Sequence, residues 1–176
     1  MPTITVTDPS VILLVGPAGS GKSTLAQRHF APDEVLSSDA MRAIVGRGES
    51  DQNASKPAFA LLHRQLRKRL AAGRLTVVDA TNLSPRARSA VLRLAHAHRM
   101  PAVAIVLDLP APMILGRSAG RVERRVDRDV VLDQLARLRE VVDRGLLERE
   151  GFVAVFRIRE PAEVDALRVE RRGQRR

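Results

Sequence analysis

The feature that most constrains this chain is a glycine-rich loop between an apolar run and a helical stretch. Residues 16–24 read Gly-Pro-Ala-Gly-Ser-Gly-Lys-Ser-Thr and fit the pattern G-x-x-x-x-G-K-[ST] at every position. The glycines let successive backbone N–H groups turn inward around an anion, and the N-terminus of the next helix adds partial positive charge. An apolar strand before this pattern and a helix after it are the context in which it binds nucleotide phosphates. The loop therefore predicts a nucleoside triphosphate site.

Two side chains of the loop are suited to phosphate chemistry. Lys22 is expected to reach the β- and γ-phosphates, and the Ser23 hydroxyl is expected to coordinate Mg²⁺. The alternative is a flexible Gly/Ser turn with an incidental lysine, and the flanking strand and helix argue against it. The residues expected to contact the nucleotide are Gly16, Ala18, Gly19, Ser20, Gly21, Lys22, Ser23 and Thr24.

Strand-like and helix-like segments alternate along the chain. Four of the five strand candidates are short apolar runs without polar alternation, as expected for strands buried on both faces. The alternation indicates a parallel sheet with right-handed crossovers, whose ligands bind at the carboxyl ends of the strands. The strand candidates are Val11–Val15, Glu34–Ser37, Leu75–Asp79, Ala102–Asp108 and Phe152–Arg157, and the helical stretches are Thr24–Phe30, Pro57–Leu70, Pro85–His98 and Asp129–Glu148.

The length of 176 residues is enough for one domain with a full core. We expect an α/β domain over residues 1–168, a three-layer αβα sandwich around a five-stranded parallel sheet. A basic tail over residues 169–176 is expected to follow it. The run from Arg168 to Arg176 holds five arginines and one glutamate, and we expect it to be frayed.

The chain is strongly basic. Its net charge is +10, and because only three of its 30 basic residues are lysine, 27 are arginine. This charge fits a phosphate-rich partner such as nucleic acid. It equally fits a codon bias toward Arg and Ala in a GC-rich genome, so composition leaves both interpretations open. With four Phe and no Tyr or Trp, stacking of bases on an aromatic platform is not expected.

Several absences indicate the compartment. The chain has no cysteine, which excludes disulfides and thiolate metal sites. No apolar run approaches the roughly 20 residues of a membrane span, and residues 1–8 lack the pattern of a signal peptide. We expect a cytoplasmic protein that does not bind membranes.

A polar cluster follows the second strand candidate. Asp39 is a candidate general base, because a carboxylate at this strand end can accept the proton of an acceptor hydroxyl and aim its oxygen for in-line attack. Its alternative role is that of a helix N-cap. Arg42 lies one helical turn further on and is suited to bind a phosphate of the acceptor, although a solvated surface arginine is the common case.

The third strand candidate ends in Asp79, with Asn82 shortly after it. A carboxylate at this position, beside the strand that leads into the glycine-rich loop, can hold a Mg²⁺-bound water or orient Ser23. We therefore take Ser23 and Asp79 as the candidate metal-binding residues. A turn-capping role for Asp79 is the alternative, and Asn82 is expected to terminate the strand.

The most basic segment runs from Leu115 to Arg128. Arg117 and Arg121 are spaced i, i+4, so one helical face presents both. Arginines that close over a transferring phosphoryl group stabilise its charge and exclude water, so we expect a helical arginine lid here. A charged surface helix is the alternative. The five arginines of the segment are Arg117, Arg121, Arg124, Arg125 and Arg128.

Together these segments resemble the 5′-kinase module of bacterial polynucleotide kinase–phosphatases, a P-loop NTPase fold found in nucleic-acid end repair. The resemblance runs from about Ser10 to Asp165. Its most specific parts are the loop, Ser38-Asp39 with Arg42, Asp51-Gln52 leading to Lys56-x-Ala58-Phe59 and Leu62-His63, residues 75–82, Val103–Val106 with Leu109-Pro110, the Arg117/Arg121/Arg124 set and Arg149–Phe152.

The resemblance implies transfer of the γ-phosphate of ATP, with Mg²⁺, to the 5′-hydroxyl of an RNA or DNA end. It implies that Asp39 is the general base, that Arg42 contacts a phosphate of the acceptor strand, and that Arg117 and Arg121 belong to a catalytic lid at about residues 112–128. Arg124 is expected to bind the acceptor from the same segment. Family members often have Glu-Arg-Asn where this chain has Gly116-Arg117-Ser118, which is a departure within the lid.

Two other classes of function stay open. The first is a small-molecule kinase of the same fold that acts on a sugar, nucleoside or antibiotic hydroxyl, because a fold does not fix a substrate. The second is a nucleotide-binding module without phosphotransfer, which the departure around Arg117 leaves possible.

Overall fold

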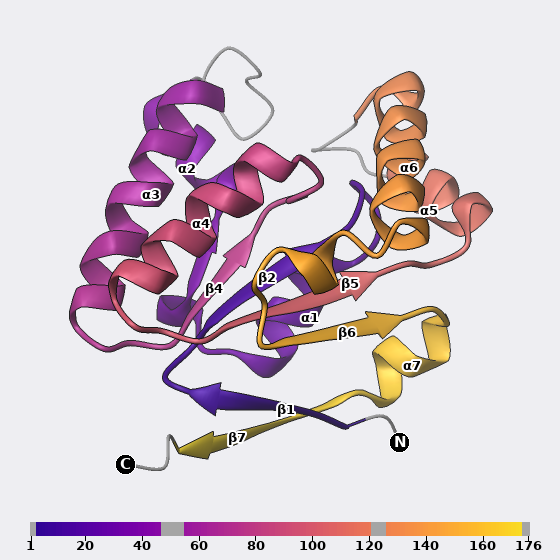
Figure 1. Ribbon diagram of the computed structural model, residues 1–176. Helices are drawn as coiled ribbons and strands as arrows, with labels where there is room; N and C mark the ends of the chain where they lie inside the picture. Colours follow the sequence, from indigo (N-terminus) through magenta and orange to yellow (C-terminus); the bar gives the residue numbers. More distant parts are fainter. Residues whose placement is uncertain (1–2, 47–54, 121–125, 174–176) are drawn as a thin grey trace.

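A five-stranded parallel sheet forms the centre of the computed structural model, which describes residues 3–46, 55–120 and 126–173 (Figure 1). The strand order is β3-β4-β2-β5-β6, with all pairs parallel. This order confirms the α/β fold and the five-stranded parallel sheet expected from the sequence. The strands are β2 (Val11–Val15), β3 (Val35–Ser37), β4 (Thr76–Asp79), β5 (Ala102–Leu107) and β6 (Ala154–Ile158).

The three central strands are buried along their whole length. Every residue of β2, β4 and β5 is buried, so both faces of these strands are covered. Alternating residues of β2 enter opposite cores, with Leu13 in one and Ile12 and Leu14 in the other. A strand in this environment needs apolar residues at consecutive positions, which explains the unbroken apolar runs of the sequence.

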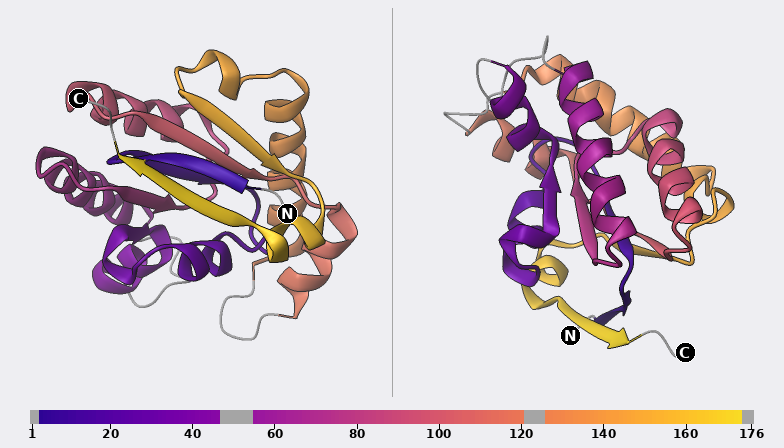
Figure 2. Two further views of the ribbon diagram at one scale, coloured as in Figure 1. Left: turned by 90° about the horizontal axis from the view of Figure 1, so that it is seen from below. Right: turned by 90° about the vertical axis from the view of Figure 1, so that its left-hand side faces the viewer.

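Helices cover both faces of the sheet, as Figure 2 shows from two further directions. One core joins the sheet to α2, α3, α4 and α6, and the other joins it to α1, α5, α7 and, through Val131, the first part of α6. The helices are α1 (Lys22–His29), α2 (Ser38–Val45), α3 (Ser55–Ala71), α4 (Pro85–Ala97), α5 (Ala111–Ala119), α6 (Arg128–Asp143) and α7 (Pro161–Ala166), with short 3₁₀ turns at η1 (Pro32–Glu34) and η3 (Leu147–Arg149). Within the described ranges, no helix is long and apolar enough to cross a membrane.

One helix is shorter than the sequence predicts. The apolar stripe indicated a helix over residues 129–148, whereas α6 ends at Asp143. Gly145 adopts a left-handed backbone conformation with φ 55°, which reverses the chain after the helix. Residues 147–149 then form the separate turn η3.

The basic run at the C-terminus corrects a second expectation. Residues Arg168–Gly173 are not frayed but form strand β7, which pairs in parallel with β1 (Thr3–Asp8) as a separate two-stranded sheet (Figure 1). Arg171 holds this strand in place, because its guanidinium donates two hydrogen bonds of 2.7 Å to Glu34 and lies 5.6 Å from the Phe30 ring centroid. Ile4 and Val6 of β1 are buried in the core beneath.

Candidate active site

The glycine-rich loop joins β2 to α1 at the carboxyl edge of the sheet. Two of its glycines are required by the backbone and by close packing. Gly21 has φ 96° at the N-cap of α1, and Gly19 has φ 87° with its Cα hydrogens against α5. A Cβ atom on Gly19 would lie 2.7 Å from the carbonyl oxygen of Ile114, which no side chain tolerates. The loop is therefore held in one shape by the helix that leads to the expected lid.

Lys22 and Ser23 take the first positions of α1. The Lys22 side chain folds back along the loop, where its ammonium group donates a 2.7 Å hydrogen bond to the carbonyl oxygen of Pro17. The residue is 8% exposed, so the charge sits in the concave side of the loop and not in open solvent. A buried cation at the N-terminus of a helix is a favourable electrostatic setting for a phosphate group.

The Ser23 hydroxyl donates a 2.7 Å hydrogen bond to Oδ2 of Asp79 at the end of β4. The sequence analysis paired these two residues as candidate metal ligands, and the fold brings them into contact. Hydroxyl and carboxylate oxygens suit Mg²⁺, which commonly takes its remaining ligands from water and substrate phosphates. The residues present therefore fit this ion, whereas no cluster of three or more His, Asp or Glu side chains among the described residues forms a closed metal cage.

Asn82 does more than end the strand. It is buried, has φ 51°, and its amide donates to the carbonyl oxygens of Leu14, Val78 and Ala80 at 2.8, 3.3 and 3.3 Å. The neighbouring Thr81 carbonyl accepts a 3.0 Å hydrogen bond from Gly16 N–H. These bonds tie the loop after β4 to β2, and they fix Asp79 relative to the glycine-rich loop.

Asp39 and Arg42 lie on α2, which follows β3 directly. The N-cap of this helix is Ser37, whose hydroxyl accepts from Ala40 N–H, so the capping role considered for Asp39 belongs to another residue. Asp39 instead forms an ion pair with Arg42 one turn later. Their side chains are 29% and 15% exposed, so the pair is partly open to a ligand.

These groups lie together because of the sheet topology. In the registers of the sheet, Ser37 pairs with Asp79 and Asp79 pairs with Leu14. The ends of β3, β4 and β2 are thus three neighbours at one edge, carrying in turn Asp39, Asp79 and the loop. Adjacent strand ends of a parallel sheet are where ligands of such folds bind.

Arg117 and Arg128 are the arginines of the expected lid segment that lie among the described residues, and Arg128, which is exposed, begins α6. Arg117 is the one that lies near the glycine-rich loop. Arg117 lies in the last turn of α5 and is exposed, and a Cβ atom placed on Gly21 would be 3.8 Å from its Nη1 atom. The guanidinium therefore lies beside the glycine-rich loop. Arg121 and Arg124 lie outside the described residues.

Two residues of this region escaped the sequence analysis. Gln134 of α6 accepts a 2.8 Å hydrogen bond from the backbone N–H of Ala18 in the loop. Arg88 of α4 is fully buried and donates to Glu150 and to the carbonyl oxygens of Asn82 and Leu83. Both were detectable as polar residues on apolar helix faces, Gln134 between Val131 and Leu138 and Arg88 in line with Val91 and Ala95.

The sequence matches one protein family, described as AAA domain, over residues 11–145. This chain belongs to the AAA domain family. The matched region contains the glycine-rich loop, Asp39, Arg42, Asp79 and Arg117. No curated protein is similar enough in sequence to match the chain.

Solved structures with the same fold include several kinases. The chain is similar to a protein of the Pnkp1/Rnl/Hen1 RNA repair complex, with 20% identity, a TM-score of 0.62, and coverage of 79% of this chain and 47% of that one. It is similar to a gluconokinase from Sinorhizobium meliloti, with 16% identity, a TM-score of 0.58, and coverage of 92% of this chain and 88% of that one. It is also similar to Kti12 from Chaetomium thermophilum in complex with ADP-AlF3, with 17% identity, a TM-score of 0.63, and coverage of 89% of this chain and 94% of that one. The fold is that of P-loop kinases, and this chain spans about half the length of the RNA repair protein.

Proposed function

We propose that this protein is an ATP-dependent polynucleotide kinase that transfers the γ-phosphate of ATP to the 5′-hydroxyl of an RNA or DNA end. The observation that carries the proposal is the ion pair of Asp39 and Arg42 at the edge of the sheet that also holds Ser23 and Asp79. A carboxylate beside a phosphate cradle serves a hydroxyl acceptor, and the adjacent guanidinium suits a phosphate of that acceptor. The similarity in fold to the RNA repair protein supports this choice.

In this proposal each residue acts on a stated group. The loop N–H groups and Lys22 hold the β- and γ-phosphates, and Asp39 accepts the proton of the attacking hydroxyl. Arg42 binds a phosphate of the acceptor strand, and Arg117 stabilises the charge that spreads over the transferring phosphoryl oxygens. Ser23 and Asp79 would hold Mg²⁺, which neutralises charge on the nucleotide phosphates when bound. Arg121 and Arg124 complete the proposed lid, at about residues 112–128.

The test is transfer of radiolabelled γ-phosphate from ATP to 5′-hydroxyl oligonucleotides. Asp39→Asn keeps the shape of the side chain but removes its basicity, so kcat is expected to fall by about 10²-fold or more. ATP binding, measured by calorimetry, is expected to persist in this variant. Asp133→Asn, an exposed residue of α6, is the matched control. Near-normal turnover of Asp39→Asn overturns the assignment of the base.

A small-molecule hydroxyl acceptor is the second candidate, and one observation favours it. The similarity in fold extends over 88% of the gluconokinase, compared with 47% of the RNA repair protein. The same assay, run with sugars, nucleosides and aminoglycosides, separates the two functions. Rapid phosphorylation of a metabolite with none of any oligonucleotide establishes the second candidate and overturns the first.

A further inference from the structure

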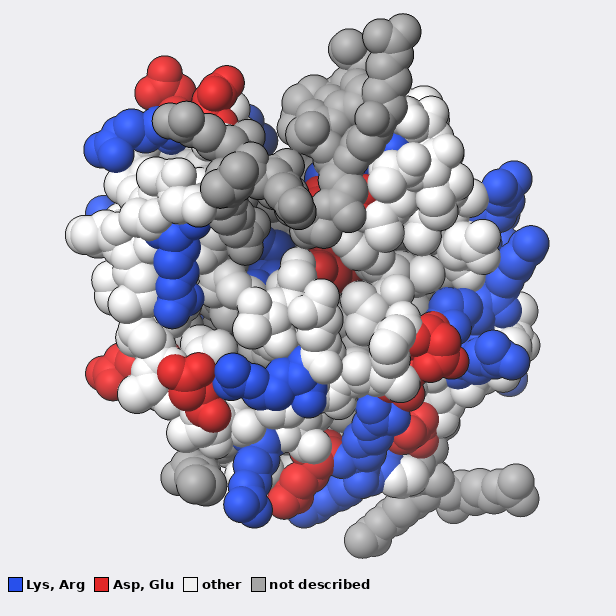
Figure 3. All heavy atoms as spheres, turned by 180° about the vertical axis from the view of Figure 1, so that it is seen from behind, with Lys and Arg blue, Asp and Glu red and all other residues white. Residues whose placement is uncertain are grey.

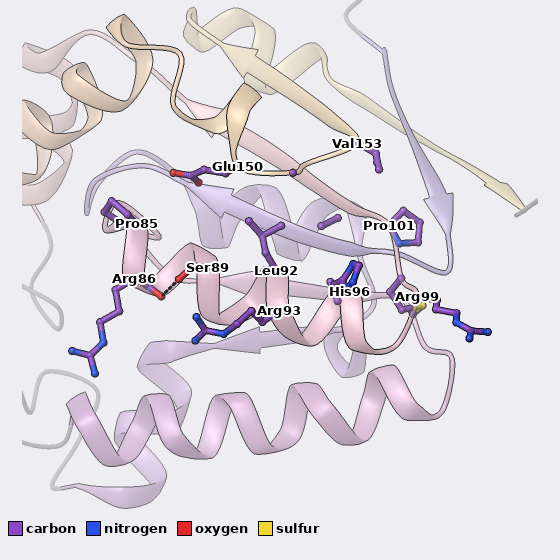
Figure 4. Close-up of a pocket in the computed structure, with 14 residues that line it drawn as sticks. Pro85, Arg86, Ser89, Leu92, Arg93, His96, Arg99, Pro101, Glu150 and Val153 are labelled. Atoms are coloured by element: carbon purple, nitrogen blue, oxygen red, sulfur yellow. Dashed lines mark hydrogen bonds between the residues drawn. The ribbon is translucent and has the colours of Figure 1, made fainter.

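A long groove lies on the outer side of α4, away from the glycine-rich loop. Its volume is about 1120 Å³, and α4 forms one wall while the chain from Glu150 to Val153 forms the other (Figure 4). Leu92 points from α4 across the groove toward this second wall. We refer to it as the α4 groove.

One wall of the α4 groove carries a row of positive charge. Arg86 and Arg93 are exposed and lie on one face of α4, with Ser89 and His96 between and beyond them at helical spacing. Arg99 follows just past the helix end, where a φ of 54° turns the chain. Figure 4 shows the side chains of Arg86, Arg93 and Arg99 extending outward.

No described carboxylate neutralises this row. Within residues 3–46, 55–120 and 126–173, none of the ion pairs involves Arg86, Arg93 or Arg99. Glu150, the acidic residue that lines the groove, is already bound through both its oxygens, at 2.6 Å each, to the buried Arg88. The groove therefore presents three guanidinium groups whose charge is not balanced locally.

The opposite face of the molecule has a different charge pattern. Figure 3 shows basic and acidic side chains lying next to one another there. Ion pairs elsewhere on the surface, such as Arg171 with Glu34 and Arg28 with Asp165, illustrate this mixing. Other described basic residues, such as Arg64 and Arg67 of α3, also have no ion pair, so what sets the α4 row apart is the groove that it borders.

The floor and length of the groove indicate the shape of its occupant. Leu92, Met100, Pro101 and Val153 give an apolar lining, and Val153 is 65% exposed. At about 1.5 Å per helical residue, Arg86 and Arg99 are separated by about 20 Å. That length spans about six phosphates of a stacked strand, at about 3.4 Å each. An apolar floor beside a basic wall matches the faces of bases next to a phosphate backbone.

We propose that the α4 groove binds a single strand of RNA or DNA without sequence preference, through Arg86, Arg93 and Arg99. The proposal rests on the proposed polynucleotide kinase function, since the bound strand is the body of the acceptor. The groove is well placed for this role. The end of the groove at Pro85 lies three residues along the chain from Asn82. The side-chain amide of Asn82 donates a hydrogen bond to the carbonyl oxygen of Leu14 in β2, just before the glycine-rich loop. A strand in the groove therefore leads away from the carboxyl edge of the sheet.

The first experiment measures binding of a fluorescein-labelled 12-nucleotide strand by anisotropy, without ATP, over a series of salt concentrations. The groove variant carries Arg86→Gln, Arg93→Gln and Arg99→Gln. The control variant removes the same charge from exposed positions of α3, as Arg64→Gln, Arg67→Gln and Lys68→Gln. The groove variant is expected to bind at least about 10-fold more weakly, and the slope of log K against log salt is expected to fall by about 2, at roughly 0.7 per lost phosphate contact. The control variant is expected to bind like the parent protein.

Equal losses in both variants, or no loss in the groove variant, overturn the proposal. Polyglutamate serves as a second probe, and its binding to the groove with the affinity of the oligonucleotide assigns the groove to acidic polypeptides instead. A kinase assay separates this proposal from the proposed kinase function on which it rests. The parent protein is expected to phosphorylate a 12-nucleotide strand with a higher kcat/KM than a dinucleotide, and the groove variant is expected to lose that preference. Equal use of both lengths overturns the groove alone, whereas phosphorylation of neither overturns the proposed function.

Discussion

Arg88 is a charged residue that the core requires. Its side chain is fully buried, and its guanidinium makes two hydrogen bonds to Glu150 and two to the carbonyl oxygens of Asn82 and Leu83. These bonds join the start of α4 to the chain before β6 and to the turn that holds Asp79 in place. A structural role of this kind places Arg88 beneath the site, as a positioning residue.

Arg88→Met is expected to lower the free energy of unfolding by about 3–5 kcal/mol, because it leaves Glu150 and two carbonyl groups without their partner. Arg88→Lys is expected to recover little, since one ammonium group cannot reach all three acceptors. Urea unfolding gives both values. Arg137→Met, which breaks an exposed pair on α6, is the control and should cost about 1 kcal/mol or less. A loss of similar size in Arg88→Met and the control would contradict the role of the network.

Gln134 contacts the glycine-rich loop although it lies in a distant part of the sequence. Its side-chain oxygen accepts from Ala18 N–H, a donor of the loop expected to hold the nucleotide. Gln134→Leu leaves this partly buried N–H without an acceptor, which is expected to destabilise the protein by about 1–3 kcal/mol. If a nucleotide phosphate accepts from the same N–H, added ATP recovers part of that loss.

Thermal unfolding of parent and Gln134→Leu proteins, each with and without ATP, measures this coupling. The expected result is a larger ATP-induced stabilisation in the variant than in the parent. Asp133→Ala, one residue earlier and exposed, controls for changes in α6 itself. An equal loss with and without ATP would show that the nucleotide does not use the Ala18 N–H.

At the scale of elements, the link between β7 and η1 shows how a basic terminal segment becomes part of the fold. Strand β7 has mostly exposed side chains and almost no apolar pattern. It is held by pairing with β1, by burial of Leu167 just before it, and by the bidentate bonds of Arg171 to Glu34. The hydrogen bonds from Arg171, with that from Ala31 N–H, hold the pKa of the Glu34 carboxyl below its ordinary value.

This shift predicts a pH dependence of stability. Because the pKa of Glu34 is lowered in the folded protein, the ion pair contributes fully above the ordinary carboxyl pKa of about 4.3 and is lost as pH falls through the lower folded value. Chemical unfolding from pH 7 to pH 3 is expected to show Glu34→Gln below the parent at neutral pH, with the gap closing on acidification. Asp165→Asn, from the more exposed pair with Arg28, should show a smaller gap. A constant gap over this range would contradict the assignment.

At the scale of the whole molecule, the candidate site depends on several elements at once. The loop after β2 contacts α5 through Gly19, α6 through Ala18 and the turn after β4 through Gly16. No single segment contains this arrangement, so the unfolded chain has no equivalent site. A ligand that binds here is therefore expected to stabilise the whole fold.

ATP with Mg²⁺ at about 100 times its dissociation constant is expected to raise the free energy of unfolding by about 2.7 kcal/mol. Lys22→Ala removes the buried cation of the loop and is expected to abolish most of this gain at the same ATP concentration. Lys68→Ala, an exposed lysine on α3, should keep it. Calorimetric melting scans measure all three proteins. Full ATP stabilisation of Lys22→Ala would contradict the assignment of the loop.

The sequence by itself determined the central sheet and the glycine-rich loop, because both depend on local patterns. Unbroken apolar runs specify strands buried on two faces, and the spacing of glycine, lysine and serine specifies an anion-binding turn. The five strands lie within about two residues of their predicted bounds, and Ser23 meets Asp79 as the order of elements suggested.

Only the tertiary structure decided the rest. The pairing of β7 with β1, the bond of Gln134 to the loop and the burial of Arg88 on Glu150 join residues 62 to 165 positions apart in the sequence. A polar residue carries no local mark of the partner that it will meet, because that partner is chosen by how the elements pack. The row of unpaired arginines on α4 could not be predicted for the same reason. The sequence shows how many charged residues there are, whereas the fold determines which of them have an ionic partner.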